Sequence, residues 1–221
     1  MNLGPGIDLE RHERWNAIVF ARPRAVLSSA PVGGGDTRAQ RIVNLCVNGP
    51  DACRECDDPA GTFRRLAAKH GWTGPLVGLM TGVSAARLGI ARTGAAGHEW
   101  SVLATAGTSN AHRAGQPPPA PSGPGTINII AATGQGLTAA ARAEAVALIA
   151  EAKTALLADL GVAAQGARHI ATGTGTDAVA VAAGTGEDVP YTGYHTASGI
   201  ALVEAVHMAV RRSLRCPARA R

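Results

Sequence analysis

Two polar segments contain most of the residues that could do chemistry, and the first is rich in glycine and threonine. It runs from Ala171 to Asp177 as ATGTGTD. Alternating glycine and threonine lets the backbone approach a ligand closely, while hydroxyl and N–H groups point into a cavity. No G-K-[ST] follows, so the segment is not a phosphate-binding P-loop. It predicts a cradle for an anion or an amide, with the Asp177 carboxylate at its edge and a wall formed by Thr172, Gly173, Thr174, Gly175 and Thr176.

The second segment, Tyr191–Thr196, holds both tyrosines of the chain and His195. It lies just before a predicted helix. The positive end of a helix dipole favours a neutral imidazole, which is the form that a general base needs. A tight turn with one buried tyrosine explains the same residues equally well.

The predicted helix from Thr138 to Leu160 carries a charge on its apolar face. At 100° per residue, Lys153 falls within the stripe of Val146, Ile149, Leu156 and Leu160, whereas Glu151 falls on the opposite side. An ammonium in that position must reach for solvent, pair with a buried carboxylate or serve in a site. The final helix shows a similar feature, because His207 lies within its apolar stripe; a hydrogen-bonded core histidine is the expectation there.

Composition limits the class of protein. The 221 residues are 46% apolar and 17% charged, which excludes intrinsic disorder. No run reaches the about 18–20 apolar residues of a membrane span, and charges near the N-terminus exclude a signal peptide. The sequence therefore predicts a soluble, cytoplasmic protein, and it leaves open whether the chain forms a homo-oligomer.

Charge and cysteine content argue against two further classes. The net charge is +5, but the chain is only 3% aromatic, so the basic stripe with interleaved aromatics of a nucleic-acid-binding protein is not expected. Cys53 and Cys56 form a C-x-x-C that could be half of a zinc site. No second pair follows at the usual distance, and Cys46 and His70 could join only if the fold gathered them. Scattered cytosolic thiols and no metal are the prediction.

Turn residues and hydrophobic patterns predict where the helices and strands lie. Helices are predicted from Asp58-Pro59 to about His70, from Thr138 to Leu160, and from Thr196 or Ser198 to about Leu214, each with a capping signal. Strands are predicted over Ala17–Phe20, Ala25–Ser29, Ile42–Val47, Leu76–Val83, Trp100–Ala106, Thr126–Ala131 and Asp177–Ala183, with a hairpin or a bend at Arg22-Pro23-Arg24 between the first two.

Strands outnumber helices and do not alternate with them, so we predict an α/β (α+β) layered sandwich with a mixed sheet and three to four helices. It forms a single domain over residues 14–214, after a polar lead over residues 1–13 and before a basic tail over residues 215–221. The Pro-rich segment 116–125 is predicted to be a surface loop.

Eight stretches of the sequence, in order, resemble one family. They are Val26–Gly35, Ile42–Val47, Val77–Thr81, Ala106–Gly115, Gly125–Ile130, Glu151–Leu156, Ala171–Ala180 and Tyr191–Thr196. The chain resembles the adenosylcobinamide amidohydrolases, the CbiZ family of cobalamin salvage. The resemblance implies hydrolysis of the amide that joins the aminopropanol arm to the corrinoid, which gives adenosylcobyric acid and aminopropanol. It implies no separate cofactor, because the corrinoid is the substrate and carries its own cobalt.

Amide hydrolysis needs an activated nucleophile, donors for the oxyanion and an acid for the leaving amine. Our hypothesis makes His195 and Asp177 a base–orienter pair acting on water, with Lys153 and the amides of Gly173–Thr176 stabilising the oxyanion. A hydroxyl nucleophile from Thr174, Thr176 or Ser29 is the rival mechanism. Glu151 is a further catalytic candidate. Substrate contacts are expected from Ser29, Asn44, Asn110, Asn128 and Tyr194.

Two other functions fit the same residues. One is a non-catalytic corrinoid-binding protein, which would bind cobinamide tightly without releasing aminopropanol. The other is a phosphate-handling transferase that uses the Gly/Thr segment, which would bind nucleotides and ignore corrinoids.

Overall fold

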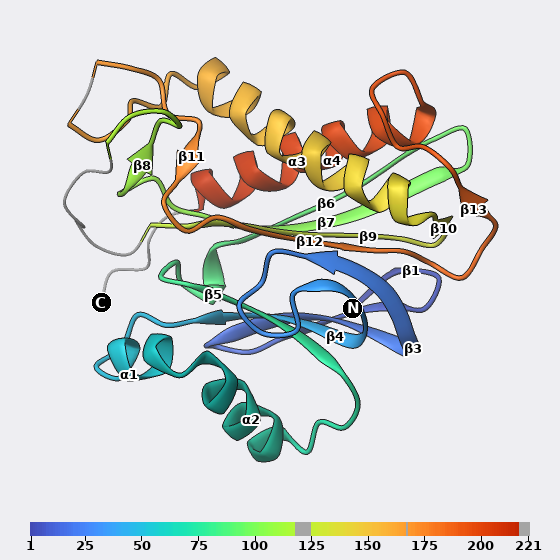
Figure 1. Cartoon of the computed structure of the whole chain (residues 1–221), viewed down its shortest axis with the longest axis horizontal. Helices are drawn as coiled ribbons and strands as arrows, with labels where there is room; N and C mark the ends of the chain where they lie inside the picture. Colours follow the sequence, from blue (N-terminus) through green and yellow to red (C-terminus); the bar gives the residue numbers. More distant parts are fainter. Residues whose placement is uncertain (118–124, 167, 217–221) are drawn as a thin grey trace.

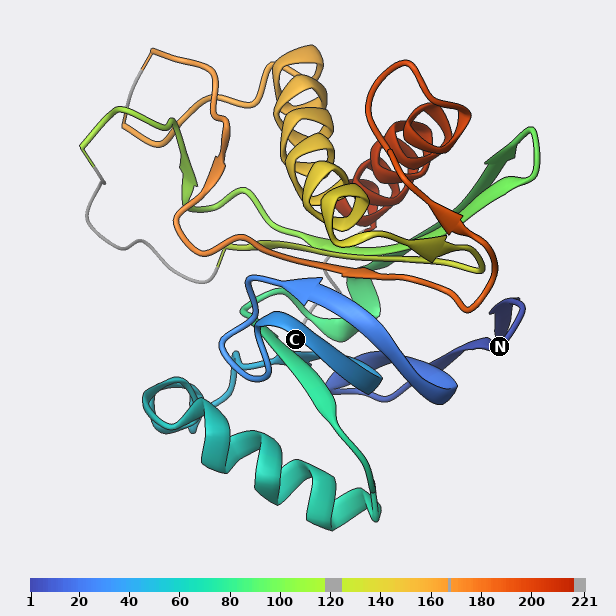
Figure 2. The same cartoon turned by 45° about the vertical axis from the view of Figure 1, so that its right-hand side comes forward.

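The computed structural model describes residues 1–117, 125–166 and 168–216. Its elements stack in four layers, helix on sheet on sheet on helix (Figures 1 and 2). The predicted mixed α+β sandwich is confirmed, because strands of one nine-stranded sheet pair both parallel and antiparallel and four α-helices accompany them.

The helix-covered upper layer is built from the later strands. Its order is β12 (Ala178–Ala182), β9 (Ile127–Thr133), β7 (His98–Ala106) and β6 (Leu88–Ala95), with β12 and β9 parallel. The helices α3 (Ala139–Asp159) and α4 (Ala197–Arg215) cover its outer face. Thr138 and Thr196 cap these helices, because each side chain accepts a backbone N–H three residues on, at 3.1 and 2.9 Å.

The lower layer is built from the N-terminal strands. Its order is β1 (Asn2–Gly4), β2 (Ile7–Arg11), β3 (Trp15–Ser28), β4 (Gly35–Cys46) and β5 (Leu76–Thr81). The helix α2 (Pro59–His70) packs below it through Phe63, and α1 (Ala52–Asp57) precedes α2 without a buried residue. As predicted, Asp58 caps α2, and Gly71 ends it with a left-handed φ of 64°.

The remaining elements are short. They are a 3-10 turn (Ala85–Arg87), the antiparallel pair β8 (Ala111–His112) and β11 (Gly173–Thr174), and the parallel pair β10 (Gly136–Leu137) and β13 (Asp188–Val189).

Strand β3 joins the two layers. Its first half pairs with β2, its second half pairs with β12, and β4 follows it along the other edge. Side chains alternate along it: Ile18 and Phe20 enter the core between the sheets, while Ala17 faces α2.

Two predictions about the N-terminal region were wrong. The expected hairpin or bend at Arg22-Pro23-Arg24 is a bulge within one long strand, where the register shifts between Val19 and Arg24. A bulge tolerates a proline because it leaves the ladder unpaired. The expected polar lead over residues 1–13 contains β1 and β2, whose Leu3, Ile7 and Leu9 are buried. Most of the Pro-rich segment and of the basic tail lies outside the described residues. No helix among the described residues is long and apolar enough to span a membrane.

Candidate active site

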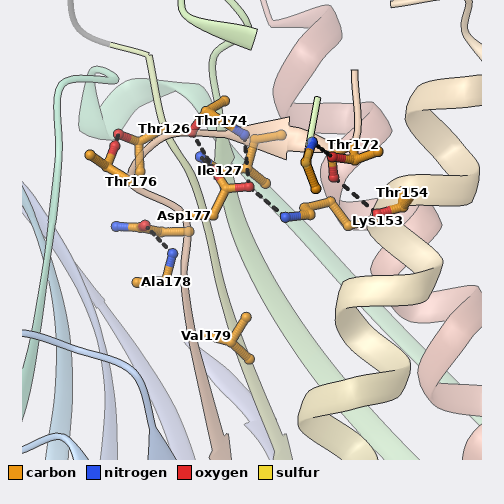
Figure 3. Close-up of polar contacts among 12 residues, drawn as sticks. Thr126, Ile127, Lys153, Thr154, Thr172, Thr174, Thr176, Asp177, Ala178 and Val179 are labelled. Atoms are coloured by element: carbon orange, nitrogen blue, oxygen red, sulfur yellow. Dashed lines mark hydrogen bonds and ion pairs between the residues drawn. The ribbon is translucent and has the colours of Figure 1, made fainter. Parts of the chain in front are cut away.

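The Gly/Thr segment and Lys153 meet at one carboxylate (Figure 3). Lys153 reaches from the middle of α3, and its Nζ lies 2.5 Å from Asp177 Oδ2. Each of the two side chains is 12% exposed. The charge on the apolar face of α3 is therefore explained by pairing with a carboxylate that the later segment supplies.

Asp177 accepts hydrogen bonds at all of its acceptor positions. Oδ2 receives the Lys153 ammonium and the Thr174 N–H at 3.0 Å, and Oδ1 receives the Ile127 N–H at 2.9 Å and the Thr174 hydroxyl. A carboxylate offers about four lone-pair sites. Asp177 thus has no free site for a water molecule, and it ties the turn to α3 and to the start of β9.

Gly173 is required by the close approach of this ion pair. A Cβ at residue 173 would lie 2.5 Å from Asp177 Oδ2 and 2.7 Å from Lys153 Nζ, both well inside contact distance. A Cβ at Gly175, two residues on, would meet no atom within 4 Å. Of the two glycines, only Gly173 is needed to leave space for the ion pair.

A cavity of about 490 Å³ opens beside the turn, where the two sheets end next to each other. Asp177 and Thr176 line it from the turn, Ser29 from the end of β3, and Asn110 from the β7–β8 region. Thr176 Oγ1 lies 2.8 Å from the hydroxyl of Thr126, which also lines the cavity. The cavity therefore brings together four of the predicted site residues.

Asn110 supplies an acceptor that lacks a donor. Its Oδ1 is buried, and no described residue donates to it. A buried carbonyl oxygen without a hydrogen bond costs about 1–3 kcal/mol, so it favours a ligand that brings an N–H group. Amides have such a group.

Sequence reasoning missed part of the cavity wall. Thr81 and Met80 contribute from β5, Thr126 from before β9, and Cys56 from α1. No periodicity marks these residues, because they meet only where strands from distant parts of the chain end together. Burial raises the pKa of the Cys56 thiol, and the nearby negative charges of Glu55 and Asp57 raise it further.

His195 was wrongly paired with Asp177. It is exposed in the loop before α4, and Thr192 of that loop donates to Glu144, near the start of α3, at 2.8 Å. Lys153 lies nine residues further along α3, about 13 Å at 1.5 Å per residue. With every acceptor site of Asp177 already used, the structure supplies no base–orienter pair.

Four other predicted site residues lie away from the cavity or are already satisfied. Asn128 donates to Asn44 Oδ1 and to the Met80 carbonyl, both at 2.8 Å, and accepts from Ala178 N at 3.2 Å. Asn44 donates to Thr105 at 2.8 Å, so these two buried amides link the sheets rather than hold substrate. Glu151 is exposed on α3, and Tyr194 is 63% exposed beside α4.

The remaining predicted residues have structural partners. Thr172 accepts from Ala114 N at 2.9 Å, and its carbonyl accepts from Thr154 at 2.9 Å. His207 bonds the Ala152 carbonyl at 2.9 Å, as expected of a core histidine. Within the described residues, no three His, Cys, Asp or Glu side chains lie together as metal ligands would.

Comparisons with known proteins agree on one family. The sequence model of the CbiZ family, described as adenosylcobinamide amidohydrolase, matches residues 5–220. A protein of Halobacterium salinarum named adenosylcobinamide amidohydrolase is 38% identical over 212 residues, which cover 89% of this chain and 83% of that protein. An uncharacterised protein of Methanocaldococcus jannaschii is 42% identical over 91 residues, 41% of this chain and 36% of that protein.

Solved structures are similar only at a distance. A Burkholderia β-aminopeptidase matches with a TM-score of 0.48 at 17% identity, over 95% of this chain and 84% of that one. A Pyrococcus horikoshii protein matches with the same TM-score at 15% identity, over 96% of this chain and 80% of that one. Similarity at this level carries no argument about function.

Proposed function

This chain belongs to the CbiZ family of adenosylcobinamide amidohydrolases, and on that basis we propose that its amide hydrolysis takes place in the cavity beside Asp177. The chain is a hydrolase of the amide C–N bond of adenosylcobinamide, and a corrinoid is its substrate. The observation that carries the assignment of the site is Asp177 at the cavity wall. Its ion pair with Lys153, which does not itself line the cavity, holds a hydroxyl-rich turn beside a space where Asn110 Oδ1 has no donor among the described residues.

We propose as the nucleophile Thr174, which does not itself line the cavity but lies two residues before the lining residue Thr176 in the same turn. Of the three hydroxyls weighed from the sequence, only that of Thr174 donates to a carboxylate, the contact that a base makes with its nucleophile. Thr176 bonds instead to Thr126, and Ser29 Oγ accepts from Val179 N at 3.1 Å. Because Asp177 has no site left for water, activation of Thr174 is favoured over direct attack by water.

The proposed reaction has two steps. Thr174 Oγ1 attacks the amide carbon while Asp177 takes its proton; the C–N bond then breaks, the proton passes to the leaving nitrogen, and aminopropanol departs. Water next hydrolyses the threonyl ester, which gives adenosylcobyric acid and restores the hydroxyl. Lys153 keeps its charge throughout and positions Asp177, so it is a positioning residue.

Product analysis tests the function and the ion pair together. Purified protein incubated with adenosylcobinamide is expected to release adenosylcobyric acid and aminopropanol over many turnovers, as measured by mass spectrometry. Lys153→Met should lower the rate about 100-fold, the scale of one lost electrostatic contact in a site. Glu151→Ala, on the exposed face of the same helix, should stay within twofold of the wild type. Substrate that binds tightly but stays intact would instead indicate a corrinoid-binding protein.

Alkylation of Cys56 tests the position of the site. An adduct on this thiol would occupy the cavity, so a bulky maleimide should abolish most turnover of the wild type and of Cys53→Ser, but not that of Cys56→Ser. Because the pKa of Cys56 is raised, its reactive thiolate forms only at higher pH, and inactivation should accelerate from about pH 8 to about pH 10. Unchanged turnover of wild-type protein that carries the Cys56 adduct would place the substrate elsewhere.

A further inference from the structure

A second cavity, of about 240 Å³, lies on the far side of the lower sheet, against α1 and α2. Part of its wall is Trp15 with Leu45 and Leu66, which are apolar. None of its lining residues is shared with the catalytic cavity. It is smaller than the roughly 300–1,000 Å³ of sites for drug-sized ligands, so its ligand must be small.

Aromatic rings fix one side of this cavity. Trp15 is buried and stacks on His12, with ring centroids 5.3 Å apart and planes 5° from parallel. His70 meets the Trp15 ring edge-on at 5.2 Å and stacks on Trp72 at 5.1 Å. Two of the three tryptophans of an aromatic-poor chain thus hold two imidazoles in place.

Both imidazoles present donors. Arg14 N donates to His12 Nδ1 at 3.2 Å, and Trp15 Nε1 donates to His70 Nε2 at 3.4 Å. A ring nitrogen that accepts leaves the proton of the neutral imidazole on the other nitrogen. His12 Nε2 and His70 Nδ1 are therefore N–H groups on rings that line the cavity.

Positive charge exceeds negative charge around the cavity. Two carboxylates, Asp51 and Glu55, line it together with the cations of Arg14, Arg54, Arg65 and Lys69. Glu55 is paired, because Arg14 Nη2 donates to its two oxygens at 2.8 and 2.9 Å. Arg65 donates to the Thr62 hydroxyl at 3.0 Å, and its contact with the Asp58 carboxylate is long, at 3.5 Å. Lys69 has no partner among the described residues.

We propose that this cavity binds a small phosphate monoester. The Lys69 ammonium, the Arg65 guanidinium and the two imidazole N–H groups suit a dianion with three acceptor oxygens. The apolar wall of Trp15 and Leu66 suits the organic part of the ester. The cavity is distinct from the catalytic one, so this inference stands apart from the proposed site of hydrolysis.

Calorimetric titration with glycerol 3-phosphate, inorganic phosphate and glycerol tests the proposal. We expect glycerol 3-phosphate to bind at least tenfold more tightly than inorganic phosphate and glycerol not to bind. Lys69→Gln should weaken binding of the ester at least tenfold. Arg64→Gln removes the same charge from an exposed position of α2 that does not line the cavity, and it should change the affinity less than twofold.

Three results would overturn the proposal. If glycerol 3-phosphate did not bind, the cavity would not be a phosphate-ester site. If inorganic phosphate bound with the same affinity, the ligand would not be an ester. Equal weakening by Lys69→Gln and Arg64→Gln would mean that diffuse surface charge attracts the anion. Lys69 is exposed, so its replacement leaves the folded protein available for each measurement.

Discussion

Thr174→Val is expected to reduce aminopropanol release by about 10³-fold or more, which is typical for loss of a nucleophile. Valine keeps the shape of the side chain but removes the hydroxyl that donates to Asp177. Thr174→Ser retains a hydroxyl and should keep at least a tenth of the wild-type rate. The rates are measured at saturating adenosylcobinamide, with the released amine quantified by mass spectrometry.

Intact-protein mass distinguishes the two routes to hydrolysis. Acid quenching during turnover should trap wild-type protein heavier by one corrinoid acyl group, and this adduct should be absent in Thr174→Val. A valine variant that turns over at nearly the wild-type rate would show that water attacks directly. Thr174 would then serve only to close the turn through its N–H and hydroxyl contacts with Asp177.

Gly173→Ala is expected to lower turnover about 100-fold or more, although it adds only one methyl group. The new Cβ would fall within 2.7 Å of both members of the ion pair, so Lys153 and Asp177 must separate or the turn must shift. Misplacement of reacting groups by about 1 Å costs about 10²-fold in rate.

Gly175→Ala is the matched control, because its Cβ meets nothing within 4 Å. Its turnover should stay within about threefold of the wild type, and both variants should show similar far-UV circular dichroism. Equal losses in the two variants would mean that the turn needs glycine for flexibility, and equal retention would show that the ion pair does not govern the reaction.

Local signals predicted the helices well, since caps and stop residues act within a few positions. Asp58, Thr138 and Thr196 cap the helices as expected. The strands β1, β2 and β6 were missed because β1 is only three residues long and because polar residues, charged residues or glycine interrupt the apolar positions of β2 and β6. Such strands are stabilised by partners that are distant in sequence, and those partners leave no local pattern.

The site was predicted in parts. Lys153 and Asp177 were each singled out, but the helical wheel shows only that Lys153 needs a partner, and the structure supplies it. His195 and Asn128 were misassigned for a common reason: residue type indicates what a side chain can do, whereas its neighbours decide what it does. The side-chain amides of Asn44 and Asn128 are hydrogen-bonded to each other between the two layers.

The shared strand β3 has a consequence for how the protein unfolds. Because β3 pairs with β2, β4 and β12, neither layer can lose its sheet without exposing the ladder of the other. We therefore expect the two layers to form a single cooperative unit, in which the paired amides of β3 exchange with solvent only on global unfolding, whereas the amides of its bulge exchange earlier. A chain break that divides the N-terminal half from the C-terminal half would leave the second half of β3 without β12 in one fragment and β12 without β3 in the other.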